Sequence, residues 1–387
     1  MNRGLVIVGG GPAAYAAAEA FRARGGTGPV VLVLAEGRHP YNRPPLSKEL
    51  LRGEAGEHEL PLEAPGWYAE RHVALRPGVA AALDLERRAV VLEDGDGLPY
   101  DTCVLATGAA PVPPPIEGTG EAGVHLLRTA EHSLALRAAA EPGLEAVIVG
   151  TGFIGCEAAA SLRARGCRVT LVSQEPAPQT GRLGPAVAAR LAGWLEEEGV
   201  TAHYGTDVER IDRRGGRLSV ATAGPELTAD LVLLASGVRA RTRLAAEAGL
   251  ALADRGEIPV DAHMRADAPG VLACGDCALA HNAAAGRPLH VEHWGDALGQ
   301  GAVAGATAAG AEAAWDDVPG FWSTIGARTL KYAAWGDGFD AVRLDANGAG
   351  FTAWYARAGR CVGVLTHERD ADYEGGRELI AAGEPPP

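Results

Sequence analysis

The stretch that decides the fold opens the chain, where residues 5–14 read Leu5-Val6-Ile7-Val8-Gly9-Gly10-Gly11-Pro12-Ala13-Ala14. Four apolar residues predict a buried strand, and the alanine-rich residues after the glycines predict a helix. Gly9, Gly11 and Ala14 have the G-x-G-x-x-A spacing of a dinucleotide-binding turn. The glycines allow a tight turn and a close approach to a pyrophosphate, and a small third residue lets the helix pack against the strand. The helix N-terminus then faces the phosphates.

The residues that follow complete this first unit. A second apolar run at 30–34 precedes Glu36, which lies 25 residues after Gly11. An acid at this place typically binds the ribose hydroxyls of the dinucleotide. A glycine-rich loop in some other α/β protein would not require strand, turn, helix, strand and acid in this order.

A second unit of the same kind begins about 140 residues later. The run Ala146-Val147-Ile148-Val149 leads into Gly150-Thr151-Gly152-Phe153-Ile154-Gly155, and a helix to about Arg165 and a strand at 168–172 are expected. The acid expected next is replaced by Ser173-Gln174-Glu175. Glu175 turning back to the ribose would favour NADH, whereas Arg182 reaching a 2′-phosphate would favour NADPH, so both dinucleotides stay open.

Between the units the chain reads His39-Pro40-Tyr41-Asn42-Arg43-Pro44-Pro45-Leu46-Ser47-Lys48. With this segment the sequence resembles the ferredoxin reductase branch of the two-dinucleotide flavoprotein reductases, which includes putidaredoxin, rubredoxin and aromatic-dioxygenase ferredoxin reductases and is similar to apoptosis-inducing factor. Later segments resemble the same family in the same order, to about residue 315: Val104-Leu105-Ala106-Thr107-Gly108, Leu233-Leu234-Ala235-Ser236-Gly237-Val238, Gly270-Val271-Leu272-Ala273-Cys274-Gly275-Asp276 and Glu292-His293-Trp294.

The resemblance implies FAD and NAD(P)H as cofactors and assigns residues to each. For FAD it implies Gly9, Gly11 and Glu36 at the adenosine half, Arg43 and Lys48 at the ring region, Asp276 at the ribityl chain, and Glu292, His293 and Trp294 beside the ring. Further FAD-binding residues that it implies are Pro12, Ala13, Ala14, Ala106, Thr107, Gly108 and Gly275. Those implied for NAD(P)H are Gly150, Gly152, Phe153, Ile154, Gly155, Ser173, Gln174 and Gly237.

Lysine usage points to the same site independently. Of 35 basic residues only two are lysines, Lys48 and Lys331, so arginine serves wherever a general cation is enough. A compact ammonium differs chemically from a guanidinium, and a rare lysine is a candidate for specific work. The resemblance implies that Lys48 lies at the flavin and pairs with Glu157, and these are the two predicted catalytic residues. The alternatives are a lysine that survives by chance on the surface and a solvated helix glutamate.

Composition limits the class of protein. The chain has 387 residues, of which 47% are hydrophobic, and a net charge of −14. These values fit two or three domains with sizeable cores and make nucleic acid an improbable partner. No apolar run approaches the roughly 20 residues of a membrane span, and no signal peptide is evident, so we expect a cytoplasmic protein with no membrane partner.

The cysteines argue against a disulfide reductase. Glutathione-reductase-like enzymes keep a Cys-x4-Cys pair beside the flavin, and the segment 41–48 contains no cysteine. Cys274 and Cys277 have redox spacing but enclose the Gly-Asp expected to bind flavin, so a working disulfide is not expected. The other four cysteines are interpreted as core residues. No metal site is predicted, because His281, His290 and His293 lack ligand spacing.

The motifs predict an α/β fold with two Rossmann-like dinucleotide-binding domains, one for FAD and one for NAD(P)H, and a small C-terminal α+β domain. The FAD domain is expected at 1–112 and 236–315, the NAD(P)H domain at 113–235 and the third domain at 316–387. Residues 316–387 carry 7 basic and 11 acidic side chains. Attraction to an acidic ferredoxin is therefore not assured, and Arg43, Arg328 and Lys331 are either a docking patch or solvated charges.

The resulting hypothesis is an FAD-dependent oxidoreductase that takes hydride from NAD(P)H and passes electrons to a ferredoxin-type acceptor. One alternative is an NAD(P)H oxidase or small-molecule reductase without a protein acceptor. Another is a redox-responsive interaction protein resembling apoptosis-inducing factor. Monomer and homodimer both remain open.

Overall fold

The computed structural model describes residues 3–387, and its first sheet is built from the N-terminal unit. Five parallel strands lie in the order β19 (Val271–Ala273), β7 (Thr102–Leu105), β1 (Leu5–Val8), β2 (Val30–Leu34) and β3 (Val73–Pro77). All four residues of β1 are buried, as the apolar run predicted. The strand order reverses at β1, and such a switch point is where open α/β sheets bind ligands.

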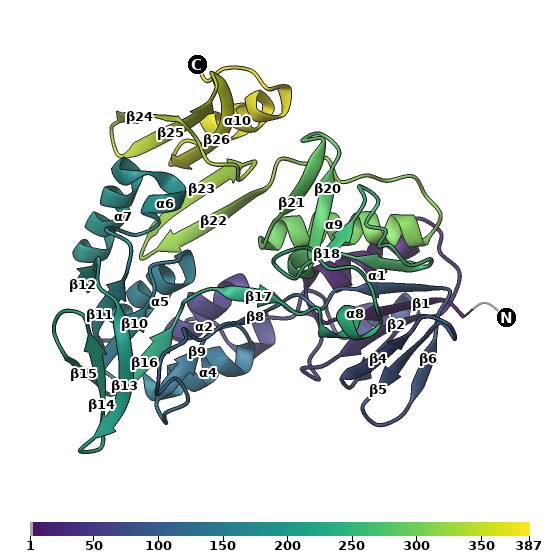
Figure 1. The fold of residues 1–387 in the computed structure, drawn as a ribbon, viewed down its shortest axis with the longest axis horizontal. Coiled ribbons are helices and arrows are strands. Elements are labelled where there is room, and N and C mark those ends of the chain that lie inside the picture. Colours follow the sequence, from purple (N-terminus) through teal and green to yellow (C-terminus); the bar gives the residue numbers. More distant parts are fainter. Residues whose placement is uncertain (1–2) are drawn as a thin grey trace.

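Two helices pack tightly beside this sheet, α1 (Pro12–Ala23) and α9 (Trp294–Ala308) (Figure 1). A Cβ on Gly301 would lie 2.3 Å from the carbonyl oxygen of Ala13, and one on Gly305 would lie 2.1 Å from that of Ala17. The small residues of both helices are therefore what allows this close approach.

The second sheet has the same parallel arrangement, with β10 in the central position. Its parallel order is β12 (Thr201–Tyr204), β11 (Arg168–Ser173), β10 (Glu145–Val149), β16 (Leu231–Leu234) and β9 (Val124–Leu126). Its helices are α4 (Ala130–Ala139), α5 (Phe153–Ala164), α6 (Thr180–Leu183) and α7 (Pro185–Glu197). An antiparallel ribbon of β8 (Ala109–Pro111) and β17 (Val238–Ala240) carries the chain out of the first sheet and back into it. The fold is thus α/β with two dinucleotide-binding units.

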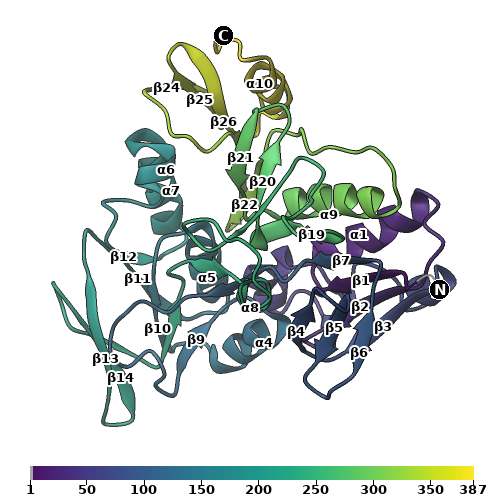
Figure 2. The same cartoon turned by 45° about the vertical axis from the view of Figure 1, so that its right-hand side comes forward.

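The third sheet is antiparallel and lies at the C-terminal end of the chain (Figure 2). Its order is β22 (Gly320–Ile325), β23 (Arg328–Ala334), β26 (Arg360–His367), β25 (Gly350–Arg357) and β24 (Ala341–Asn347), and α10 (Asp370–Ala382) packs on β26 and β23. The expected hairpins and final helix are present, although α10 begins seven residues before the predicted Arg377. The domain boundaries given above stay a prediction.

Smaller elements complete the chain. Three-stranded sheets form from β4 (Ala80–Asp84), β5 (Ala89–Leu92) and β6 (Gly97–Pro99), from β13 (Val208–Arg214), β14 (Arg217–Thr222) and β15 (Leu227–Ala229), and from β18 (Ile258–Val260), β20 (Ala278–Asn282) and β21 (Arg287–His290). Short helices are η1 (Pro44–Ser47), α2 (Glu49–Arg52), η2 (Glu57–Glu59), α3 (Gly66–Glu70), α8 (Arg243–Glu247) and η3 (Gly275–Cys277). None of the helices in the described part of the chain is long and apolar enough to cross a membrane.

Candidate active site

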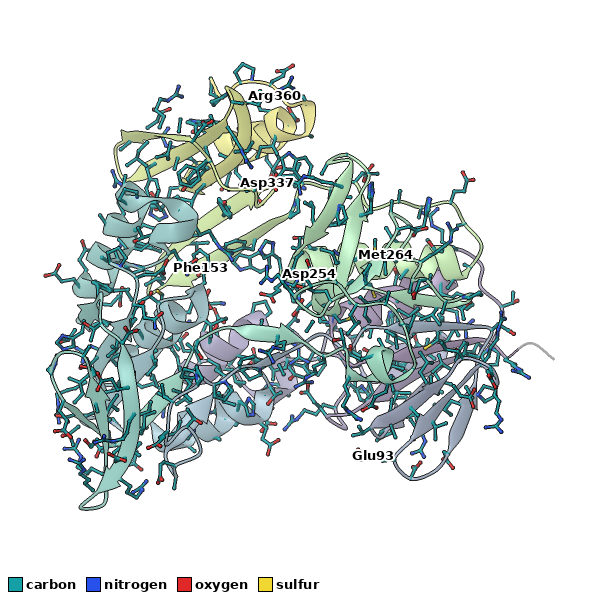
Figure 3. All side chains as sticks on the ribbon, in the orientation of Figure 1. Glu93, Phe153, Asp254, Met264, Asp337 and Arg360 are labelled. Carbon is teal, nitrogen blue, oxygen red and sulfur yellow. The ribbon has the colours of Figure 1, made fainter. Side chains whose placement is uncertain are left out.

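A single large cavity joins the two glycine-rich turns. Its volume is about 1760 Å³, and both turns, the 39–48 segment and residues of β22 and β23 line it. Pockets for one small molecule usually measure roughly 300–1,000 Å³. Figure 3 labels Phe153, at the start of α5, which is one of the residues that line this cavity. The cavity is large enough for two extended ligands that meet.

Gly9 and Gly11, the two motif glycines of the first turn, have different roles. Gly9 has φ +147°, and a Cβ on it would lie 2.1 Å from the carbonyl oxygen of Ala106. A Cβ on Gly11 would meet nothing within 4 Å because Gly11 faces the open cavity, with Pro12 and Ala13 beside it. Gly9 is needed for the fold of the turn, whereas Gly11 keeps space for a ligand.

The third position of each motif does not line the cavity. Ala14 is fully buried, and a Cβ on Gly155 would lie 2.2 Å from the carbonyl oxygen of Gly150. Both residues allow the helix to pack closely on the strand. The prediction that Ala14 and Gly155 contact a cofactor is therefore corrected to a packing role. Every other predicted site residue lines the cavity.

Glu36 lies at the end of the cavity nearest β2 and is held by two neighbours. It accepts hydrogen bonds from the Tyr41 hydroxyl (2.6 Å) and from Arg43 Nη2 (2.9 Å). Burial raises the pKa of Glu36, but the Arg43 charge and the two hydrogen bonds outweigh it, so that the net pKa is lowered. Glu36 is therefore an ionised acceptor that can serve ribose hydroxyls.

Arg128 also belongs to the site, although no sequence pattern identified it. It forms an ion pair with Asp276, 148 residues further along, and its carbonyl oxygen accepts from Arg43 Nη1 (2.9 Å). The N–H of Gly275, next to Asp276, donates to the buried Gln300 of α9 (2.8 Å). A lone arginine before a helix carries no motif, so only the folded chain shows that it faces Asp276.

The two predicted catalytic residues meet. Lys48 Nζ lies 2.9 Å from Glu157 Oε2, and the residues are only 6% and 3% exposed. The alternatives of a chance surface lysine and a solvated helix glutamate are therefore wrong. Ser47 also donates to Oε2, while Ser323 Oγ (2.8 Å) and the Thr324 N–H (3.1 Å) donate to Oε1. A buried ion pair needs such additional hydrogen bonds to offset its desolvation.

The other wall carries the 292–294 segment. Trp294 contacts Trp322 edge to face (5.7 Å between ring centroids), and Phe153 contacts Phe321 in the same way (4.8 Å). His290 lies between two carboxylates, 3.1 Å from both Glu257 and Glu292. Hydrogen bonding to Glu292 raises the pKa of His290 against the opposing effect of burial.

At the ribose end of the second unit, Glu175 turns back toward the glycine-rich turn. Its carboxylate accepts from the N–H groups of Gln179 and Gly181 (both 3.1 Å) and lies 3.4 Å from Thr151 Oγ1. Ser173 Oγ is hydrogen-bonded to Thr151 Oγ1 (2.7 Å). An acid is therefore present here although position 173 lacks one, and Gln174 and Gly237 also line the cavity.

The six cysteines are free and buried in the described chain. Burial raises the pKa of the Cys274 and Cys277 thiols, which keeps both protonated and unreactive near neutral pH. No group of three metal-binding side chains occurs among the residues that the structure describes.

Comparison with known proteins agrees with this geometry. The sequence profile of the pyridine nucleotide-disulphide oxidoreductases matches residues 3–313. The chain belongs to this family. Members combine FAD with NAD(P)H, and the chain is an NAD(P)H-dependent flavoprotein reductase. Unlike the disulphide reductases that give the family its name, it has no disulfide at the cavity formed by its described residues.

Several relatives in the pyridine nucleotide-disulphide oxidoreductase family match nearly the whole chain. The ferredoxin–NAD(+) reductase component of the anthranilate 1,2-dioxygenase system of Burkholderia cepacia is 36% identical over 99% of this chain and 95% of its own. Putidaredoxin reductase of Pseudomonas putida is 31% identical over 98% and 92%. The solved covalent complex of putidaredoxin reductase with putidaredoxin aligns with a TM-score of 0.94 at 30% identity, covering 99% of this chain and 94% of that one.

Proposed function

We propose that the protein takes hydride from NADH onto bound FAD and passes electrons singly to a ferredoxin-type protein. The observation that carries the proposal is the buried Lys48–Glu157 pair, which joins the segment after the first dinucleotide turn to the helix of the second. Relatives named as ferredoxin, rubredoxin and putidaredoxin reductases support the acceptor class.

The residues present fit both cofactors. The open face of Gly11 and the N-terminus of α1 suit the FAD pyrophosphate, Glu36 its ribose, and Arg128 with Asp276 the ribityl chain. When bound, the flavin supplies the hydride acceptor and the ability to release electrons one at a time. Lys48 places a fixed positive charge on the cavity wall. Glu157, which also accepts a hydrogen bond from Ser47, holds that ammonium in place. A fixed cation in a site that excludes water stabilises negative charge developing beside it.

NADH is the preferred donor in this proposal because of Glu175. Two backbone N–H groups orient its carboxylate next to the glycine-rich turn, where it would accept ribose hydroxyls and repel a 2′-phosphate. The relatives named as NAD(+) reductases are consistent with this choice.

The acceptor surface is proposed at the aromatic mouth of the cavity. The charges suspected from the sequence are already paired within the chain: Arg43 with Glu36, Arg328 with Glu197 and Glu198, and Lys331 with Asp370. Trp322 is 42% exposed and contacts Trp294, which this proposal assigns to the flavin ring region. We also propose a cytoplasmic setting, which the six free thiols support.

Cytochrome c reduction with NADH in the presence and absence of a ferredoxin tests this function. Reduction that depends on the ferredoxin supports it. Rapid oxygen uptake with no response to ferredoxin would instead favour the oxidase or small-molecule reductase alternative.

A further inference from the structure

We propose that Ser323, on the third sheet, is a positioning residue of the hydride-transfer site and acts through Glu157. The inference rests on the proposed function of the Lys48–Glu157 pair. It means that the C-terminal sheet takes part in the chemistry and is more than a cover for the cavity.

The carboxylate of Glu157 receives donors from two segments that lie far apart in the chain. Ser47 ends η1 and Lys48 follows it, and both donate to Oε2. Ser323 and the N–H of Thr324 belong to β22 and donate to Oε1. In these contacts the Lys48 ammonium and the Thr324 N–H can only donate, so both carboxylate oxygens act as acceptors. Each oxygen has two donors, which leaves the carboxylate a single orientation.

The register of β22 against α5 explains why these residues meet. Phe153 and Glu157 are four residues apart on one face of α5, and Phe321 and Ser323 are two apart on one face of β22. The Phe153 and Phe321 rings are 4.8 Å apart, and the next step along both elements places Ser323 on Glu157. The aromatic contact therefore sets the position at which the hydroxyl reaches the carboxylate.

The backbone of β22 reinforces the arrangement. β22 is one of the two edge strands of its sheet and pairs there with β23. The Thr324 N–H points away from β23 and would have no partner in the sheet, and Glu157 supplies one. Ser323 is 1% exposed, so water does not replace its hydroxyl readily.

The consequence for the reaction runs through Lys48. If Ser323 is lost, one oxygen of Glu157 keeps only the Thr324 N–H, and the carboxylate can rotate away from the ammonium. The positive charge on the cavity wall is then less well placed, while the NADH-binding turn and Glu175 are unchanged. The step affected is hydride transfer at saturating NADH, not NADH binding.

The experiment compares Ser323→Ala with Ser323→Thr, which keeps a hydroxyl in a strand. Stopped-flow flavin reduction by NADH should be about tenfold slower in Ser323→Ala at saturation, as expected for loss of one hydrogen bond to a charged group, with little change in the NADH concentration for half-maximal rate. The flavin reduction potential should fall as well, and Ser323→Thr should recover most of both losses. Thr329→Ala is the matched control. It removes a half-buried hydroxyl from the neighbouring strand β23, and this hydroxyl is hydrogen-bonded to Thr324 Oγ1 and not to Glu157.

Double variants separate this role from a merely structural one. In a Glu157→Gln background, Ser323→Ala should add little further loss of rate, and the melting temperatures of the apoproteins should be non-additive in the same pair. Equal rates and potentials in Ser323→Ala and the unaltered protein, or simple additivity with Glu157→Gln, would overturn the inference. If NADH fails to reduce the flavin of the unaltered protein, the proposed function itself is wrong.

Discussion

At the scale of single residues, the two lysines occupy opposite environments. Lys48 is buried against Glu157, whereas Lys331 pairs with Asp370 at the surface. Lys48→Ala should slow flavin reduction by NADH roughly 100-fold, the cost of removing a preorganised charge from such a site. Lys331→Ala is the control and should retain the rate. Stopped-flow spectroscopy measures both, and equal rates for the two variants would contradict the role of Lys48.

His290 gives a prediction for pH. Its pKa is raised in the folded protein by Glu292, so its contribution to stability is complete below the unfolded value of about 6.5 and is lost as pH rises through the higher folded value. The melting-temperature difference between the unaltered protein and His290→Gln should therefore be largest near pH 5.5 and shrink above neutral pH. A difference that does not change with pH would show that the ion pairs with Glu257 and Glu292 contribute nothing.

At the scale of elements, the first turn makes opposite demands on its two glycines. Gly11→Leu fills open cavity and should give a folded protein that lacks FAD. Gly9→Val forces a side chain into the carbonyl of Ala106 at positive φ and should impair folding itself. The flavin-to-protein absorbance ratio and the melting temperature distinguish the two outcomes. A yellow Gly11→Leu protein would mean that the pyrophosphate lies elsewhere.

Helix packing provides a second test at this scale. Gly305→Ala should destabilise the protein by roughly 1–3 kcal/mol, because its Cβ meets the Ala17 carbonyl of α1. Gly193→Ala on α7 faces open space and should be neutral or slightly stabilising. Urea unfolding measures both changes. A neutral Gly305→Ala would show that α1 and α9 pack less closely than described.

The features that could be predicted from the sequence are those encoded in short local motifs. Both glycine turns and the strands before them follow from short motifs. The rarity of lysine singles out Lys48, and the family resemblance implied its pairing with Glu157. Arg128 and Ser323 could not be predicted in this way, because their importance comes from contacts between residues far apart in the chain. The turn of Glu175 toward the glycine-rich loop was one of two alternatives, and the sequence could not choose between them. A lone arginine or serine has no signature until the fold gives it a partner.

At the scale of the whole molecule, three sheets meet around one cavity. The preference for NADH over NADPH depends on Glu175, which follows the carboxyl end of β11 in the second sheet. Glu175→Gln should weaken NADH and favour NADPH, shifting the preference by roughly tenfold toward NADPH. The ratio of half-saturating concentrations measures this. Equal losses for both dinucleotides would mean that Glu175 only supports its loop through the Gln179 and Gly181 N–H groups.

The central claim is that NADH reduces a bound flavin beside Lys48 and that the electrons leave to a ferredoxin. The most direct measurement is anaerobic stopped-flow reduction of the purified yellow protein by NADH and NADPH, followed by mixing with a ferredoxin and cytochrome c. The account predicts fast bleaching with NADH, slower bleaching with NADPH and cytochrome reduction only when ferredoxin is present. Flavin that stays oxidised with both donors would contradict it.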